Sequence, residues 1–338
     1  TEDFETYIES LESCTPEWAE EVSGVPAEDI RQAARMYATA EAAAFYWGMG
    51  ISQSTHGTDN ALALTNLALM TGQVGRPGTG LNPLRGQNNV QGCSDSGGLP
   101  NVFTAYQPVT NPEVRAKFEQ VWHTTLSADP GLTVTEMVDG ALMGNIKAMV
   151  VMGENPLMSE PNLSHAQHAI ECLDLLVCID IFMNETGQLA DVILPSVSFA
   201  EKDGTFTNSD RRIQRVRQAI PTVGQARVDW QIVCDLAKRM EAKLNISESA
   251  GFDYADVESI WEEMRNVTPP FYGITYERLE REGGVHWPCP NLDHPGTPYL
   301  FEEDFPRGRG KFWALEYGTD SEITDADYPF HLTTGRVL

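Results

Sequence analysis

The 338-residue chain carries 49 acidic against 23 basic side chains, which gives a net charge of -26 at pH 7 and an isoelectric point near 4.5. This balance argues against nucleic-acid binding through a basic face, and no apolar run is long enough to span a membrane. The six cysteines form no C-x-x-C pair, so neither a close zinc or iron–sulfur ligand set nor a small disulfide scaffold is indicated, and we expect reduced thiols.

The acidity of the chain has two interpretations. Seventeen of the basic residues are arginine and six are lysine, and the carboxylates are spread along the chain. The protein is either an ordinary acidic protein or one whose surface is adapted to high salt, where charge keeps it soluble; we favour the second and expect a cytoplasmic location. The chain shows no signal peptide, lacks an initiator Met and stops inside an expected strand, so we expect a part of a longer protein.

Helices and one strand are expected in the first third of the chain. Residues 1–24 have the pattern of an acidic helical segment, and Pro26 suits the first turn of the next helix. An apolar strand is expected at 43–47, followed by the loop 48–53 and by a helix near 58–69 whose leucines should lie in the core. Glycines at 72, 75, 78 and 80 then end this helix.

The stretch 82–100 combines four closely spaced carboxamides with four glycines around a single cation, Arg85. Because glycine favours turns, we expect neither a helix nor a regular strand here. Arginine offers a rigid fork of donors to a carboxylate or phosphate, and carboxamides offer paired donors and acceptors. The stretch is either a surface loop or a ligand-facing loop; its length and its central charge favour the second.

Alternating strands and helices are expected in the middle of the chain. An irregular region follows residue 100, and then the pattern Thr133-x-x-Glu136 predicts a capped helix to about residue 143. Apolar strands are expected at 147–152, 173–179 and 191–194, with a helix between the first two. Strands that are apolar on both faces indicate a parallel sheet covered on both sides. The predicted fold class is therefore α/β, with parallel-sheet αβα (Rossmann-like) domains.

Ligands of such sheets bind beyond the carboxyl ends of the strands. Three segments lie there, at 48–53, at 153–156 and at 180–186. Asp180 suits hydrogen bonding to a ribose hydroxyl or to a guanine edge, and a role as a turn or cap residue is an equal alternative. No G-x-G-x-x-G follows a strand, so the usual NAD fingerprint is missing.

The last part of the chain is expected to be mostly surface. The segment 198–217 holds the densest positive charge, which could face phosphates, an acidic neighbouring domain or solvent. An amphipathic helix is expected at 229–240 and another near 257–265, within long surface connections that extend to about residue 328. A new strand is expected from residue 330.

Several sequence blocks carry a resemblance to a known family. RGQNNVQG (85–92), CSDSGGLPN (93–101) and YQP (106–108) closely resemble the catalytic (alpha) subunit of molybdenum- or tungsten-dependent formate dehydrogenases, in the DMSO reductase family of molybdopterin oxidoreductases. Other blocks follow in family order, including GMGISQ (48–53), MGENPLMSEPN (152–162), DIFMNETGQLADVILP (180–195), EKDGTFTNSDRRIQR (201–215) and TTGRVL (333–338). One departure is Cys93-Ser94-Asp95-Ser96-Gly97, where the family usually has Ala-Cys-Asp-Met-Gly.

The resemblance implies a fold and an activity. It implies oxidation of formate to CO2, or the reverse, at Mo or W held by a bis-molybdopterin guanine dinucleotide, with electrons passed through a 4Fe–4S cluster to an iron–sulfur or diaphorase-type subunit. The metal and cluster ligands are expected outside this sequence. The chain would contain the end of a first αβα domain (1–84), a second, cofactor-binding αβα domain (85–328) and the start of a C-terminal pterin-binding domain (329–338). The alternatives are another molybdopterin oxidoreductase, such as a nitrate reductase, and a non-catalytic electron-transfer scaffold.

Site residues are implied position by position. Arg85 matches the family's active-site arginine, which would clamp the carboxylate of formate. Gln87 matches a pterin contact, Asn155 and Asp180 match the nucleotide end, and Arg336 matches a contact made by the last domain. With the remaining loop positions, the expected cofactor-binding residues are Met49, Gly50, Gln53, Arg85, Gln87, Gly153, Asn155, Asp180, Thr186, Lys202, Asp229 and Arg336; no metal ligand is expected.

Overall fold

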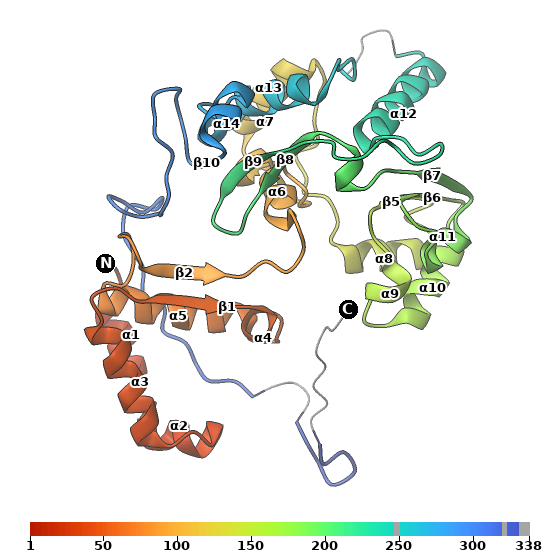
Figure 1. Ribbon diagram of the computed structural model, residues 1–338. Helices are drawn as coiled ribbons and strands as arrows, with labels where there is room; N and C mark the ends of the chain where they lie inside the picture. Colours follow the sequence, from red (N-terminus) through yellow and green to blue (C-terminus); the bar gives the residue numbers. More distant parts are fainter. Residues whose placement is uncertain (247–250, 320–322, 331–338) are drawn as a thin grey trace. The chain divides into compact units, whose positions relative to one another are not determined.

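The computed structural model describes residues 1–246, 251–319 and 323–330. The chain forms two compact units, one from Thr1–Gln87 with Pro298–Leu338 and the other from Asn88–Thr297 (Figure 1). The segment after residue 297 therefore belongs with the N-terminal unit, whereas the sequence placed 298–328 with the second domain. The proposed division into three domains of the family stays a prediction.

The first unit contains helices and a two-stranded parallel sheet. Its elements are α1 (Phe4–Ser10), α2 (Pro16–Ser23), α3 (Ala27–Thr39), β1 (Ala44–Trp47), α4 (Met49–Ser52), α5 (Gly57–Thr71) and β2 (Gly80–Pro83). The expected early helices and the strand are confirmed. The leucines of α5 are only half-buried, and its buried residues include Asn66 and Ala68. Asn66 can be buried because its side-chain amide donates to the Trp313 carbonyl and accepts from the Trp313 N–H.

The second unit contains one parallel and two antiparallel sheets. Its helices are α6 (Val90–Asp95), η1 (Thr104–Tyr106), α7 (Pro112–Trp122), α8 (Val134–Leu142), α9 (Pro156–Ser159), α10 (Leu163–Glu171), α11 (Glu185–Leu189), η2 (Phe199–Glu201), α12 (Asp229–Leu244), α13 (Val257–Asn266), η3 (Pro269–Phe271) and α14 (Tyr276–Glu282). Its strands are β3 (Val102–Phe103), β4 (Gln107–Pro108), β5 (Ala148–Met152), β6 (Leu175–Asp180), β7 (Val192–Pro195), β8 (Gly204–Thr207), β9 (Arg212–Val216) and β10 (Val285–His286). The predicted capping box of α8, formed by Thr133 and Glu136, is confirmed.

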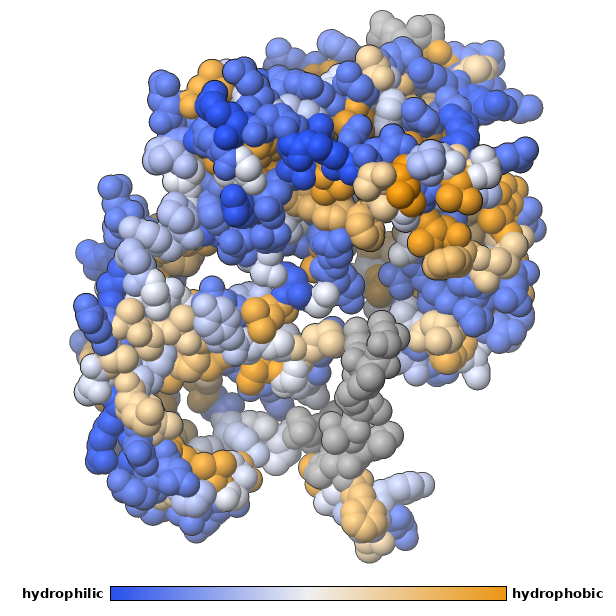
Figure 2. Space-filling model, in the orientation of Figure 1, coloured by the Kyte–Doolittle hydropathy of each residue, from blue (hydrophilic) through white to orange (hydrophobic). Residues whose placement is uncertain are grey.

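The sheet β5-β6-β7 is parallel throughout, which confirms the predicted α/β class. On one face Leu176 and Cys178 pack with side chains of α9 and α10 and are almost fully buried. On the opposite face Val150 is 54% exposed and Met152 is 53% exposed. Figure 2 shows apolar side chains gathered over this part of the unit. On the same face Ile179 of the central strand β6 is only 2% exposed, so the expected cover is present over part of this face as well.

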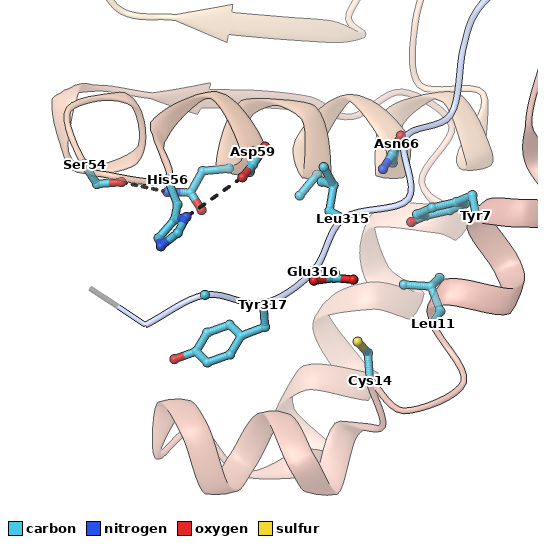
Figure 3. A pocket seen from close by; sticks show the side chains of 13 residues that line it. Tyr7, Leu11, Cys14, Ser54, His56, Asp59, Asn66, Leu315, Glu316 and Tyr317 are labelled. Carbon is cyan, nitrogen blue, oxygen red and sulfur yellow. Dashed lines mark hydrogen bonds and ion pairs between the residues drawn. The ribbon is translucent and has the colours of Figure 1, made fainter. Parts of the chain in front are cut away.

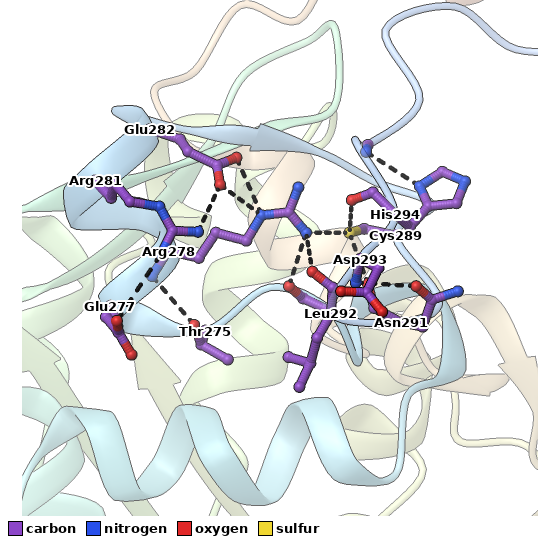
Figure 4. Close-up of polar contacts among 12 residues, drawn as sticks. Thr275, Glu277, Arg278, Arg281, Glu282, Cys289, Asn291, Leu292, Asp293 and His294 are labelled. Carbon is purple, nitrogen blue, oxygen red and sulfur yellow. Dashed lines mark hydrogen bonds and ion pairs between the residues drawn. The ribbon is translucent and has the colours of Figure 1, made fainter.

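The segment expected to be surface connection contains a buried cluster instead. Trp261, Phe271, Ile274 and Leu279 pack there with side chains of β9 and β10. Arg278 is buried beside this cluster, and its Nε lies 3.0 Å from both carboxylate oxygens of Glu282. Its Nη1 donates to the Gly273 carbonyl and lies 3.1 Å from the Cys289 sulfur (Figure 4). The elements that carry this cluster are too short and irregular for its side chains to form a periodic pattern in the sequence.

The stretch 82–100 also differs from its prediction. Pro83 ends β2 and the short helix α6 runs from Val90 to Asp95, so within this stretch residues 84–89 and 96–100 are irregular. Asn89 turns the chain into α6 with a positive φ of 61°, a conformation that asparagine tolerates better than most residues. The expectation of no helix in this stretch is therefore wrong. The strand expected from residue 330 lies almost wholly outside the described residues.

Candidate functional site

The first group of predicted residues follows the two parallel strands of the first unit. β1 and β2 run parallel with Trp47 beside Pro83, and the Leu84 N–H donates to the Trp47 carbonyl at 2.7 Å. Both strands therefore end at the same edge of the sheet. Beyond that edge lie the residues predicted to contact the cofactor in this unit: Met49, Gly50, Gln53, Arg85 and Gln87.

This edge offers open space and polar side chains. Arg85, Gln87 and Gln53 are exposed. A Cβ added at Gly50 or Gly86 would meet no atom within 4 Å, so a ligand can approach the backbone closely there. A guanidinium, two carboxamides and accessible backbone groups are a donor and acceptor set that suits a carboxylate or a heterocycle.

The second group follows strands β5 and β6 of the other unit. Gly153 continues the ladder by donating its N–H to the Ile179 carbonyl at 2.9 Å, and it takes a positive φ of 63°. The Asn155 Oδ1 accepts from the N–H of Thr186 at 3.2 Å and from its hydroxyl at 2.7 Å. The Asn155 amide donates to Glu185 at 2.7 Å, and this bond lowers the pKa of the Glu185 carboxyl. Parallel pairing thus brings Gly153, Asn155 and Thr186 together at one edge.

Asp180 ends β6 at the same edge. Its Oδ1 accepts from the Ile181 N–H at 2.6 Å and its Oδ2 accepts from the Asn184 amide at 2.8 Å. These bonds are those of a turn residue, the alternative that the sequence left open. Since a carboxylate has about four acceptor sites, the same group can still receive a donor from a ligand.

Lys202 and Asp229 form an ion pair between the residue after η2 and the first residue of α12. The resemblance implied these two as separate cofactor contacts, whereas their side chains pair with each other. Arg336 lies outside the described residues.

The arginines of 198–217 interact within their own unit. Arg215 and Arg217 both pair with Glu280 of α14. Arg211 donates to the carbonyls of Trp287 and Thr297. The sequence left phosphates, an acidic neighbouring domain and solvent open as partners of this positive charge. Within the described residues, these arginines contact Glu280 of α14 and backbone carbonyls.

Two groups near the Arg85 segment were missed from the sequence. Asn89 Oδ1 accepts from the Thr207 N–H at 2.9 Å, which links the RGQNNVQG and GTFTN blocks. Asp95 is 1% exposed and accepts from the Gln91 amide and the Trp287 indole, each at 2.7 Å. No local pattern could reveal the contacts of Asn89 with Thr207 and of Asp95 with Trp287, because these partners are far apart in sequence. The shifted Cys93 is exposed.

A third missed group shows a pattern that the sequence did contain. Ser198-x-x-Glu201 forms a capping box, in which Glu201 accepts from the Ser198 N–H at 2.8 Å. The other carboxylate oxygen accepts from the Val223 N–H at 2.7 Å. These bonds hold the pKa of the Glu201 carboxyl below its ordinary value.

A pocket of about 390 Å³ lies elsewhere in the first unit (Figure 3). Asp59, Glu316, His56 and Tyr317 are among the residues that line it, and none of the predicted site residues does. The His56 Nε2 lies 3.1 Å from the Thr319 carbonyl oxygen. Two carboxylates in the lining do not suit an anionic ligand such as formate or a phosphate.

Metal-ligating clusters and membrane-spanning helices are both absent from the described residues. No three or more His, Cys, Asp and Glu side chains gather there in a way that could hold a metal ion. None of the helices described is both long enough and apolar enough to cross a membrane.

Comparison with known proteins gives consistent results. A family model described as molybdopterin oxidoreductase matches residues 31–239. The chain is 47% identical to the F420-dependent formate dehydrogenase subunit alpha of Methanocaldococcus jannaschii, over 100% of this chain and 49% of that protein. It is 41% identical to formate dehydrogenase H of Escherichia coli, over 99% of this chain and 47% of that protein. The chain thus spans about half the length of these relatives.

A solved structure shows the same fold at low sequence identity. Acetylene hydratase from Pelobacter acetylenicus matches with a TM-score of 0.60 and 19% identity, over 85% of this chain and 41% of that chain.

Proposed function

Because the chain belongs to the molybdopterin oxidoreductase family, we propose that it is part of a formate dehydrogenase alpha subunit, which oxidises formate to CO2 or catalyses the reverse reaction. The position of Arg85 carries this proposal: the side chain is exposed and lies two residues after the carboxyl end of β2, which pairs in parallel with β1. The relatives named formate dehydrogenases, at 41–47% identity along the chain, support the choice of substrate.

Arg85 would act by holding the substrate. Formate offers a protein one carboxylate and one C–H bond. A planar guanidinium can donate two parallel hydrogen bonds to that carboxylate, which fixes its orientation as well as its position. Orientation of this kind lets a reaction proceed without a search for the productive geometry.

The cofactor that we propose is bis-molybdopterin guanine dinucleotide with Mo or W. Its fit to this chain rests on the open space beside Gly50, Gly86 and Gly153 and on the polar residues around it. When bound, the group supplies the two-electron chemistry, whereas the protein binds and orients. Residues that would hold it are Met49, Gly50, Gln53, Arg85, Gln87, Gly153, Asn155, Asp180, Thr186, Lys202, Asp229 and, outside the described residues, Arg336.

The remaining elements of the proposal concern electron transfer. A 4Fe–4S cluster, with ligands outside this sequence, would pass electrons to an iron–sulfur or diaphorase-type subunit. The protein would work in the cytoplasm. Co-purification of the full-length protein with such a subunit tests the partner. Iron and sulfide analysis of the purified protein tests the cluster.

The proposed activity is tested with the full-length protein that contains this sequence. Metal analysis should find Mo or W, and formate should reduce an artificial electron acceptor. A protein without either metal would contradict the enzymatic proposal. Turnover of nitrate with no turnover of formate would instead favour a nitrate reductase.

A further inference from the structure

The segment that carries Arg85 is fixed at both ends by hydrogen bonds. On the N-terminal side, the Leu84 N–H donates to the Trp47 carbonyl at 2.7 Å within the first unit. On the C-terminal side, the Asn89 Oδ1 accepts from the Thr207 N–H at 2.9 Å within the second unit. Residues 85–88 between these bonds are exposed and irregular. The course of this short segment therefore depends on its two ends.

The C-terminal bond joins Asn89 to a well-packed strand. β8 is the edge strand of the sheet β10-β9-β8, and Thr207 at its end is only 8% exposed. Thr207 lies beside Ile213 in the ladder, and Ile213 is 1% exposed in the buried cluster of this unit. The amide of Asn89 takes the place of a strand carbonyl at this edge. It ties the segment to a rigid part of the unit.

Gly92 makes room for this amide. A Cβ built on Gly92 would collide with Asn89 Oδ1 and would lie 2.9 Å from its Cγ. Any larger residue at position 92 must therefore displace the carboxamide from Thr207. The backbone adds a second constraint, because Asn89 has a φ of 61°.

From these contacts we infer that Asn89 is a positioning residue for substrate binding, which holds the segment of Arg85 by its hydrogen bond to Thr207. This inference rests on the proposed function. Asn89 is four peptide bonds from Arg85, and a shift of its end of the segment moves the guanidinium. Small displacements of a binding group have large effects on how well a substrate is held.

Three variants of the full-length protein test the bond. Asn89→Gly removes the amide but keeps a residue that accepts positive φ. Gly92→Ala keeps the amide but pushes it from Thr207. The double variant combines both changes, and its added methyl group no longer meets a carboxamide. Asn245→Gly is the matched control, because Asn245 is an exposed asparagine with a φ of 55° at the end of α12.

Two measurements are needed for each variant. The first is KM and kcat for formate, and we expect KM to rise about tenfold in both single variants with a smaller change in kcat. The double variant should have a KM for formate no higher than that of Asn89→Gly, since the two changes break the same bond. The second is amide hydrogen exchange of 204–208, which should become faster in these three variants and stay unchanged in the control.

The outcomes separate this inference from the proposed function. Faster exchange at 204–208 with an unchanged KM would overturn the positioning role, as would a loss of kcat alone, which is what a merely structural role predicts. An Asn89→Gly variant with unchanged exchange would show that the bond is absent in solution, and this too overturns the inference. A wild-type protein that holds Mo or W and yet does not turn over formate would overturn the proposed function, and the inference with it.

Discussion

Replacement of Asn155 by alanine tests whether this residue organises the edge of the β5-β6-β7 sheet. Its Oδ1 is the shared acceptor for the N–H and the hydroxyl of Thr186. Thr186 is completely buried. In Asn155→Ala both donors therefore lose this partner.

The cost follows from the number of donors. A buried donor without a partner costs about 1–3 kcal/mol. The hydroxyl of Thr186 can rotate, so the two groups together should cost about 2–4 kcal/mol of local stability. Since about 1.4 kcal/mol corresponds to a factor of ten, the Thr186 amide should exchange its hydrogen roughly 30-fold to 700-fold faster.

Hydrogen exchange of the full-length protein measures this effect, because exchange reports local opening where global unfolding of a multi-unit protein does not. Asn155→Asp is the matched variant. It keeps an acceptor for Thr186 but sets a second carboxylate beside Glu185 in place of the donor, so its exchange at Thr186 should lie between that of the wild type and that of Asn155→Ala. An Asn155→Ala variant whose Thr186 amide exchanges within threefold of wild type would refute the reasoning, and so would a faster rate in Asn155→Asp than in Asn155→Ala.

Three further predictions concern other side chains. Arg85→Ala should abolish formate-dependent dye reduction yet leave the Mo or W content near that of the wild type, and Arg85→Lys should also be poor because a point charge replaces a fork; wild-type turnover in Arg85→Ala would rule out the clamp. The lowered pKa of Glu201 means that its contribution to stability is present above its ordinary pKa of 4.5 and is lost as the pH falls through the lower folded value. Glu201→Gln should therefore flatten the acid side of a plot of unfolding temperature against pH, and an unchanged acid side would contradict this role. Arg278→Leu should lower the local stability measured by hydrogen exchange of 273–282 by about 3 kcal/mol, because the Gly273 carbonyl loses its donor and the Glu282 carboxylate keeps only that of Arg281; a loss below about 1 kcal/mol would contradict the assigned contacts.

Local signals in the sequence predicted the fold where neighbours along the chain determine the structure. The capping box at Thr133 needs only four consecutive residues, and it is present. The strands β5 and β6 were recognised because each is a continuous apolar run. The buried cluster around Trp261 was missed, since its side chains come from short elements without a common period. The helix α6 was missed because Asn89 and Gly92 look like loop residues until the contact with Thr207 is known.

The candidate site was predicted partly from the residues themselves and partly from the resemblance to a known family. The length and the central charge of the stretch around Arg85 favoured a ligand-facing loop, and the resemblance supplied the other positions. Parallel pairing of β1 with β2, and of β5 with β6, explains why those positions follow strand ends. The pairing of Lys202 with Asp229 spans 27 residues and no local rule predicts it. The roles of these residues toward a cofactor stay predictions.

The proposal that this chain is part of an enzyme that oxidises formate is tested by following the carbon. The full-length protein is given ¹³C-labelled formate and an artificial one-electron acceptor, after its Mo or W content has been established. Formate oxidation releases two electrons, so we expect one labelled CO2 for every two molecules of the one-electron acceptor that are reduced. A metal-loaded protein that releases no labelled CO2 would contradict it.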